Sequence, residues 1–354
     1  MNPYENLPPQ AFWRPAVSAV SLFSISGLWD PKFQINRKSK IATFGSCFAQ
    51  HFGRELRDRK FNWMNTESAP FGLSPENQKL YNYDVFSCRT TNIYTTSLLR
   101  HWVELSLKLH SPSTEIWHDN SRFRDPLRPT VEPTGFSSEA ELLASRAQAV
   151  SSFEQIIRTS DVFVFTLGLT ESWVNAETGY EYQMCPGTAG GAFDETVHKF
   201  VNQDFTTVSR NLRFVISKMR SVNPKLKFLL TVSPVPLTAT MSGNHVLVAT
   251  MASKSILRAV CAQLSSEIAL VDYFPSYEII NSPAFKGVFF EPNMRNVHKS
   301  GVDFVMKAFF NALASKFKVP ADAPKQLAPA QRNEEEVVCE EELLAAFGNS
   351  SGAT

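Results

Sequence analysis

Short apolar segments alternate with amphipathic segments along most of the chain, and this alternation restricts the possible folds more than any other feature. The apolar segments lie at 40–45, 161–167, 227–232 and 269–272. Apolar residues recur with helical spacing at about 47–59, 94–109, 138–159, 204–221, 249–266 and 299–315. Continuous apolar strands are typical of parallel sheets buried on both faces, and their alternation with helices indicates right-handed crossovers. The chain is therefore predicted to be an α/β protein, a three-layer α/β/α sandwich with a mostly parallel sheet.

Three regions of different composition divide the chain. Residues 1–38 place Trp and Phe among polar residues, so we expect an N-terminal arm that packs on the core with little regular structure. Residues 39–317 carry the alternating pattern and include a long insertion at 62–135. Residues 318–354 are rich in Ala, Pro and Glu, and their composition favours a flexible acidic tail. The alternative for this tail is that its few apolar residues dock on a partner.

Composition excludes several classes of function. Acids and bases nearly balance at a net charge of +1, so nucleic acid and anionic membranes are not expected as partners. The first residues lack a secretory signal, and no stretch approaches the ~20 apolar residues of a membrane span. Five scattered cysteines lack metal-ligand spacing, so we expect no metal, no cofactor and a cytoplasmic location. The oligomeric state is left open.

A serine stands at the junction between the first apolar segment and the helical pattern that follows it. The run Ile41-Ala42-Thr43-Phe44-Gly45-Ser46-Cys47-Phe48-Ala49 changes from strand-like to helix-like at this serine. Ligands of parallel α/β sheets bind at the carboxyl edge, and helix starts offer N–H groups without partners. An exposed hydroxyl and donors for a developing oxyanion are what an acyl-transfer nucleophile needs. The alternative is that Ser46 is only a helix N-cap.

The same junction carries a resemblance to a known family. The string Thr43-Phe44-Gly45-Ser46-Cys47-Phe48-Ala49 resembles the signature of the GSCFA family, which is similar to the SGNH/GDSL esterase and acyltransferase superfamily. Further stretches match the family in the same order, at 60–62, 70–72, 166–173, 231–237, 253–258 and 273–278. The resemblance therefore covers most of the chain between about 40 and 312 and implies an SGNH-like, flavodoxin-like domain.

The resemblance also implies a set of site residues. Ser46 would be the nucleophile and His298 its general base, since the superfamily has the serine early and the histidine late. Gly72 matches the second sequence block, whose glycine N–H faces the oxyanion. Gly168 and Thr170 lie in the stretch that matches the third block, where the superfamily has an oxyanion-binding Asn.

Two residues next to these matches are expected to support the site. Cys47 follows the serine and is expected to be buried by packing rather than to act as a nucleophile. Glu171 ends a buried strand, where an unpaired carboxylate is costly. It is expected to anchor the loop at 180–182 or to bind a substrate hydroxyl.

The chain departs from the superfamily pattern at one important position. Arg295 stands where an Asp would orient the histidine, and a guanidinium cannot accept the histidine N–H. Glu291, Asp303 or a backbone carbonyl is the possible replacement. His245 is the second candidate for the base.

A helix face at 253–258 carries Lys254 and Arg258, which suit either an anionic substrate group or plain surface charge.

Together these features predict a serine-dependent ester hydrolase or O-acyltransferase. The resemblance to the superfamily implies carbohydrate O-acetyl esters as one substrate class. The alternative is a ligand-binding scaffold that has kept the fold and lost the catalytic residues. A third reading is an assembly role through the arm and the tail.

Overall fold

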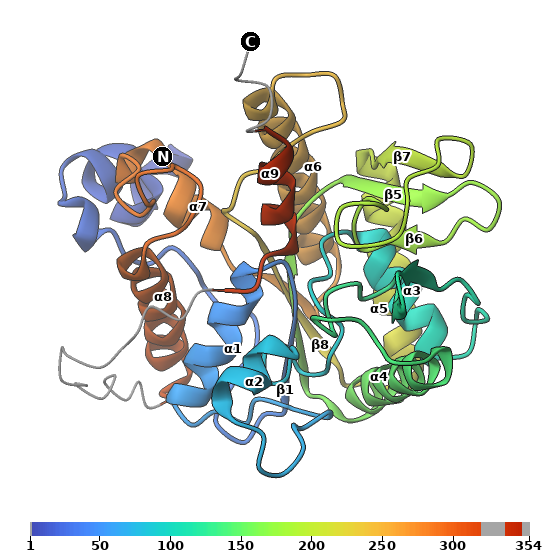
Figure 1. Cartoon of the computed structure of the whole chain (residues 1–354). Helices are drawn as coiled ribbons and strands as arrows, with labels where there is room; N and C mark the ends of the chain where they lie inside the picture. Colours follow the sequence, from blue (N-terminus) through green and yellow to red (C-terminus); the bar gives the residue numbers. More distant parts are fainter. Residues whose placement is uncertain (1, 320–336, 349–354) are drawn as a thin grey trace.

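A four-stranded parallel sheet forms the centre of the protein in the computed structural model, which describes residues 2–319 and 337–348. The strand order is β1-β4-β8-β9, and each neighbouring pair is parallel (Figure 1). The strands are β1 (Ile41–Gly45), β4 (Val162–Leu167), β8 (Lys227–Val232) and β9 (Val271–Tyr273). All four lie where the apolar segments predict them, within one or two residues.

Helices cover both faces of this sheet. Phe163 and Phe165 of β4 pack in the core on one face, and Val162 and Val164 pack in the core on the other. The first face is covered by α3 (Thr96–Ser106), α4 (Glu139–Thr159), α5 (Phe205–Val222) and α6 (Val246–Glu267). The second face is covered by α1 (Phe48–Asp58), α7 (Ser276–Asn281) and α8 (Lys299–Phe317). Because successive strand residues point to opposite faces, one apolar strand fills both cores, and the predicted three-layer sandwich is confirmed.

Two small antiparallel sheets lie outside the central sheet. The insertion holds α2 (Pro75–Leu80) and the pair β2 (Trp117–Asp119) and β3 (Arg122–Arg124). A second sheet has the order β6-β5-β7, with β5 (Glu171–Asn175), β6 (Glu181–Tyr182) and β7 (His198–Asn202). The sequence pattern does not predict this sheet, because its strands are short and, apart from β6, only partly buried.

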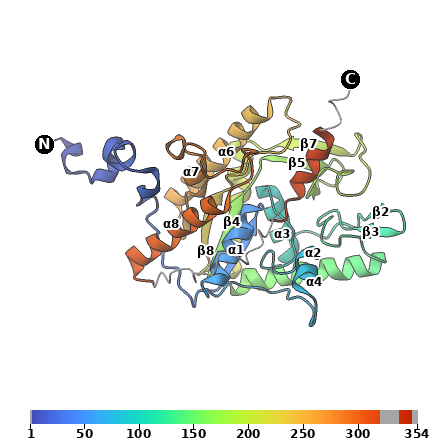
Figure 2. The same cartoon turned by 60° about the vertical axis from the view of Figure 1, so that its left-hand side comes forward.

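The two terminal regions differ from their predicted form. Ile25, Trp29, Phe33 and Ile35 are buried against the second face, but most residues before Ile25 are exposed and project from the body (Figure 2). These exposed residues form short turns of helix at η1 (Pro3–Asn6), η2 (Pro9–Ala11), η3 (Arg14–Ser18) and η4 (Leu22–Ser24). The arm is thus packed on the core mainly in its last third.

Part of the predicted acidic tail is folded onto the domain. Residues 337–348, called the strap here, include η6 (Glu340–Leu344) and α9 (Ala345–Gly348). Val338 packs against the first core. The rest of the predicted tail, 320–336 and 349–354, lies outside the described residues.

Helix α6 is the one described helix whose length and apolar composition would allow it to cross a membrane. It packs against α5 and against strands β8 and β9, as a core helix of an α/β sandwich does.

Candidate active site

The carboxyl ends of β1, β4 and β8 bring three polar segments to one edge of the sheet. Ser46 follows β1, and its N–H donates to Thr166 O of β4 at 3.0 Å. Ser233 follows β8, and its N–H donates to Leu167 O at 2.8 Å. Gly45 has a φ of +134°, and a Cβ there would lie 2.2 Å from Thr166 O. Only glycine therefore allows the chain to turn so close to its neighbour before Ser46.

Ser46 is buried, and its hydroxyl has no hydrogen-bond partner in the described chain; the same is true of the hydroxyl of Thr166 on the neighbouring strand. Gly168, after β4, lies so close that a Cβ on it would be 3.0 Å from Ser46 Cβ. Cys47 and Phe48 begin α1, where N–H groups have no partner within the helix. The serine hydroxyl therefore has backbone N–H donors beside it and makes no structural hydrogen bond. A helix N-cap would instead accept a hydrogen bond from the first turn of the helix.

Lys254 is a buried charged group that binds the segment beside this serine. Its ammonium donates to Gly168 O at 2.7 Å, and the side chain is only 1% exposed. Burial lowers the pKa of Lys254 to about 8. The preceding Ser253 accepts the N–H of Thr170 at 3.1 Å, so the start of α6 holds the segment after β4 in place.

The sequence predicts Lys254 as a partner for an anionic substrate group or as surface charge; surface charge is wrong, because the side chain is buried. The available signal was its spacing: Lys254 lies three residues before Leu257, which is fully buried. A lysine on the apolar stripe of a core helix needs a reason to be there, and the helix spacing would have shown it.

Thr170 and Glu171 serve the scaffold of the site. The Thr170 hydroxyl donates to Asn202 Oδ1 of β7 at 2.7 Å, so its proton is already used in a structural hydrogen bond. Glu171 accepts hydrogen bonds from the Thr240 hydroxyl and, at 3.2 Å, from the N–H of Met241. It anchors the loop before α6 and not the predicted loop at 180–182.

Gly72 lies in an exposed turn, and a Cβ on it would meet nothing within 4 Å. The segment that reaches the sheet edge instead comes just before α3. Ile93 N–H donates to Gly45 O at 2.9 Å, and Tyr94 O accepts the N–H groups of Gly168 and Leu169, each at 3.0 Å. The residues that contact the sheet edge from this part of the chain are thus Ile93 and Tyr94, which carried no matching motif.

His298 is placed at the start of α8 and is about half exposed. Its Nδ1 accepts the N–H of Ser300 at 3.2 Å, and its Nε2 lies 3.9 Å from Glu291 Oε1. Glu291 therefore lies near Nε2 and not near Nδ1, the nitrogen that an orienting carboxylate would bind, and Asp303 pairs with Lys299 at 3.6 Å. No hydrogen bond joins His298 to Ser46 in the described chain.

The second candidate base makes no hydrogen bond to Ser46 in the described chain either. His245 is the exposed N-cap of α6, and its Nδ1 accepts the N–H of Leu247 at 3.2 Å. Among the described residues, no three His, Cys, Asp or Glu side chains gather closely enough to hold a metal ion.

The strap covers the serine junction. The main chain of Val338 makes two bonds with the Gln50 side chain, at 2.6 and 2.9 Å, and its carbonyl accepts from Asn92 Nδ2 at 2.8 Å. The thiols of Cys47 and Cys339 are hydrogen-bond partners, and this bond with burial raises the pKa of the Cys47 thiol well above its usual range. Cys47 is therefore buried as expected, but against a segment from the far end of the chain.

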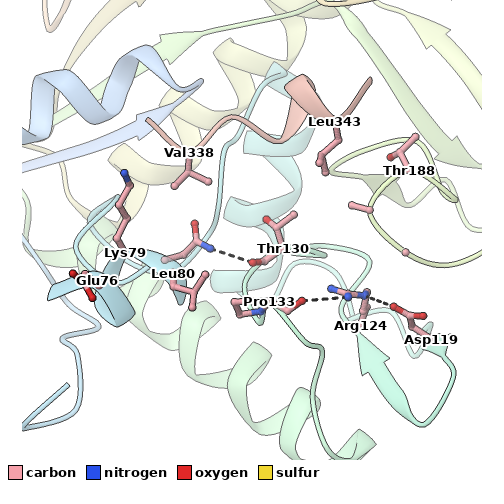
Figure 3. A pocket seen from close by; sticks show the side chains of 13 residues that line it. Glu76, Lys79, Leu80, Asp119, Arg124, Thr130, Pro133, Thr188, Val338 and Leu343 are labelled. Atoms are coloured by element: carbon pink, nitrogen blue, oxygen red, sulfur yellow. Dashed lines mark hydrogen bonds and ion pairs between the residues drawn. The ribbon is translucent and has the colours of Figure 1, made fainter. Parts of the chain in front are cut away.

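Two cavities flank the strap. The first, of about 650 Å³, lies between the insertion and the strap, and Val338 and Leu343 point toward it from above (Figure 3). The second, of about 310 Å³, is mainly apolar and is lined by Trp173 and Phe200 from the small sheet and by Leu344 and Phe347 from the strap. Thr188 lines both.

Glu181 provides a pH test of the second cavity, whose wall it forms. It is 5% exposed, its carboxylate accepts from the Thr95 hydroxyl, and burial raises its pKa from 4.5 to about 7. The folded state holds the proton more tightly, so its stabilising contribution is complete below pH 4.5 and is lost as pH rises through 7.

Glu181→Gln is therefore expected to increase the free energy of unfolding at pH 8 by about 3 kcal/mol and to change it little at pH 4. Urea unfolding at both pH values measures this difference. Equal changes at the two values would show that Glu181 is not a buried, titrating group.

Comparisons with known proteins place the chain. The model of the GSCFA family matches residues 40–309. No curated protein matches the chain. A solved structure from Streptococcus pneumonia, described as a candidate platelet activating factor, is similar at 12% identity and a TM-score of 0.27. That match covers 49% of this chain and 66% of the other, so the chain spans just under two thirds of that structure. Since the family model matches most of its length, this protein belongs to the GSCFA family.

Proposed function

We propose that this protein is a serine-dependent ester hydrolase or O-acyltransferase of the SGNH type that acts through Ser46. The observation that carries the proposal is the buried, unpartnered Ser46 hydroxyl at the carboxyl edge of a parallel sheet, beside a buried lysine. In the reaction, Ser46 Oγ attacks the ester carbonyl, the ester C–O bond breaks, and the alcohol leaves with a proton. Water or a second hydroxyl then takes the acyl group and restores the serine.

The N–H groups at the start of α1 support the oxyanion in this scheme. Cys47 and Phe48 follow the nucleophile directly, and backbone donors fixed beside a reacting carbonyl stabilise the negative charge that forms on its oxygen. The dipole of α1 acts in the same direction.

We further propose Lys254 as the group that takes the serine proton. With a pKa of about 8, about half of its amines are neutral at pH 8 and able to accept a proton. Its ammonium is hydrogen-bonded to the carbonyl of Gly168, a residue on which a Cβ would lie 3.0 Å from Ser46 Cβ. The resemblance assigns this role to His298, but the ring nitrogens of that residue face Ser300 and Glu291. Serine–lysine pairs perform the same chemistry on other folds.

A binding scaffold without catalysis is the second candidate function. Two observations favour it: no histidine is bonded to Ser46 in the described chain, and the strap covers the junction. Carbohydrate O-acetyl esters remain a proposed substrate class under the first function, and an assembly role is a third proposal.

Intact-mass spectrometry after incubation with a fluorophosphonate tests the proposed function. We expect one adduct on the wild type, none on Ser46→Ala, and one on Ser233→Ala, which removes another buried serine from the same sheet edge. The adduct is also expected on the Glu340→Ala/Glu341→Ala variant, in which the strap is weakened. A folded protein with no adduct in any of these variants would contradict an activated serine and favour the binding scaffold.

A further inference from the structure

The strap lies in a groove in which two of its carboxylates, those of Glu340 and Glu341, each have their own set of hydrogen-bond donors. The strap, drawn in red in Figure 1, begins beside α1 and ends near the small sheet. It separates two cavities that share the wall residue Thr188. The strap is thus an occupant of the groove, with open space on both sides of it.

Glu340 has a complete set of polar partners in this groove. Its side chain is 2% exposed. One carboxylate oxygen accepts from Tyr94 Oη at 3.0 Å and from the Asn92 amide, and the other accepts from the Thr130 hydroxyl at 3.1 Å. A carboxylate loses its hydration on burial, and only such a set of donors offsets that cost.

Glu341 binds at a second position in the groove, where positively charged side chains surround it. It is 7% exposed, and it accepts from the N–H of Thr238 at 2.7 Å and from Arg295 at 3.4 Å. Lys254 adds a further positive charge that acts on the same carboxylate. Arg295 is the residue that stands where the superfamily has an Asp. Its positive charge is the charge that a binding site for an anion requires.

We propose that the groove beside Ser46 is a binding site for a carboxylate-bearing ligand, and that the strap fills it as a ligand supplied by the chain itself. The substrate class that follows is an ester with a carboxylate close to the reacting carbonyl and an apolar part for the 310 Å³ cavity. This substrate class rests on the proposed function of Ser46, whereas the carboxylate site does not.

The strap and the substrate therefore compete for one place. Acylation of Ser46 requires the strap to leave. Weakening the hydrogen bonds and ion pairs that hold Glu340 and Glu341 therefore increases the reactivity of the serine. If the strap instead supplied a catalytic carboxylate, the same weakening would decrease it.

The first experiment measures strap release in the full chain. Glu340→Ala/Glu341→Ala is compared with Glu342→Ala, which removes an exposed acid from the same run. We expect the double variant to react with fluorophosphonate at least 10-fold faster than the wild type and to exchange the amide hydrogens of 337–348 faster. The Glu342 variant should change the rate less than 3-fold, because exposed ion pairs contribute little. An unchanged or slower rate in the double variant would overturn the competition.

The second experiment measures carboxylate binding without catalysis. The full chain with Ser46→Ala and Glu340→Ala/Glu341→Ala receives a fluorescent peptide of residues 337–348, and anisotropy gives its Kd. We expect binding that weakens at least 10-fold when the peptide carries Gln at positions 340 and 341 or when the protein carries Arg295→Met. Monomethyl succinate should displace the peptide at concentrations at least 10-fold lower than methyl butyrate, its neutral analogue.

The two experiments separate the two proposals. Peptide binding that does not depend on Glu341, Arg295 or the succinate carboxylate would reject the carboxylate site even in a protein whose Ser46 is reactive. Carboxylate-dependent binding in a protein whose Ser46 never reacts would reject the esterase and keep the site.

Discussion

Lys254→Met is expected to lower the rate of Ser46 acylation about 1,000-fold, within the range that a lost general base costs. Lys254 is buried, and its ammonium is bonded to Gly168 beside the serine. Methionine has nearly the same length but cannot accept a proton. The reaction with fluorophosphonate, followed by mass, measures the rate, and thermal unfolding of the same variant shows that it folds.

The pH dependence distinguishes a base from a structural lysine. The wild-type rate should rise with pH and level off with an apparent pKa of about 8, since only the neutral amine accepts the proton. Lys254→Arg keeps the charge but not the ability to lose a proton at neutral pH, so it should remain as slow as the methionine variant.

His298→Ala is the matched comparison. It is expected to change the rate less than 3-fold, because its nitrogens face Ser300 and Glu291. A large loss in His298→Ala together with a small one in Lys254→Met would return the role of base to the histidine.

Asp125→Ala is expected to destabilise the protein by about 3–5 kcal/mol, the cost of leaving buried charges without their partner. Asp125 is fully buried, 3.0 Å from Arg128 Nε and 2.7 Å from Arg146 Nη2. Urea unfolding at pH 7 measures the loss. Asp119→Ala is the control: Asp119 pairs with Arg124 at 2.9 Å but is 40% exposed, and its loss should cost less than about 1 kcal/mol.

The same aspartate gives a pH prediction of opposite sign to that of Glu181. Burial by itself raises the pKa of Asp125, but the two guanidinium groups outweigh it and hold the pKa below its usual 3.8. Its contribution is therefore present above pH 3.8 and is lost as pH falls through the lower, folded-state pKa. Asp125→Asn should lack this acid-dependent part of the loss, and identical acid profiles would contradict the assignment.

The sheet and its helices were predictable because their signals are local. Each central strand is an uninterrupted apolar run, such as Val162–Leu167, and each long helix shows its buried stripe within its own residues, whereas the short α7 was not predicted. The position of Ser46 follows from the same kind of signal, since the change from strand to helix occurs within a few residues. Parallel pairing of β1, β4 and β8 then places the three polar segments at one edge.

The contents of the site depended on contacts between distant parts of the chain. Val338 meets Gln50 across 288 residues, and Arg295 meets Glu341 across 46. No periodicity within the acidic run shows that two of its carboxylates are buried, because composition alone favours a solvated tail. His298 likewise carries an ordinary local pattern, and the helix spacing that puts Lys254 on the buried stripe with Leu257 does not show which groups its ammonium binds. Packing determines that the lysine is enclosed beside the serine while the histidine remains at the surface, because burial and hydrogen-bond partners belong to the folded chain and not to a sequence window.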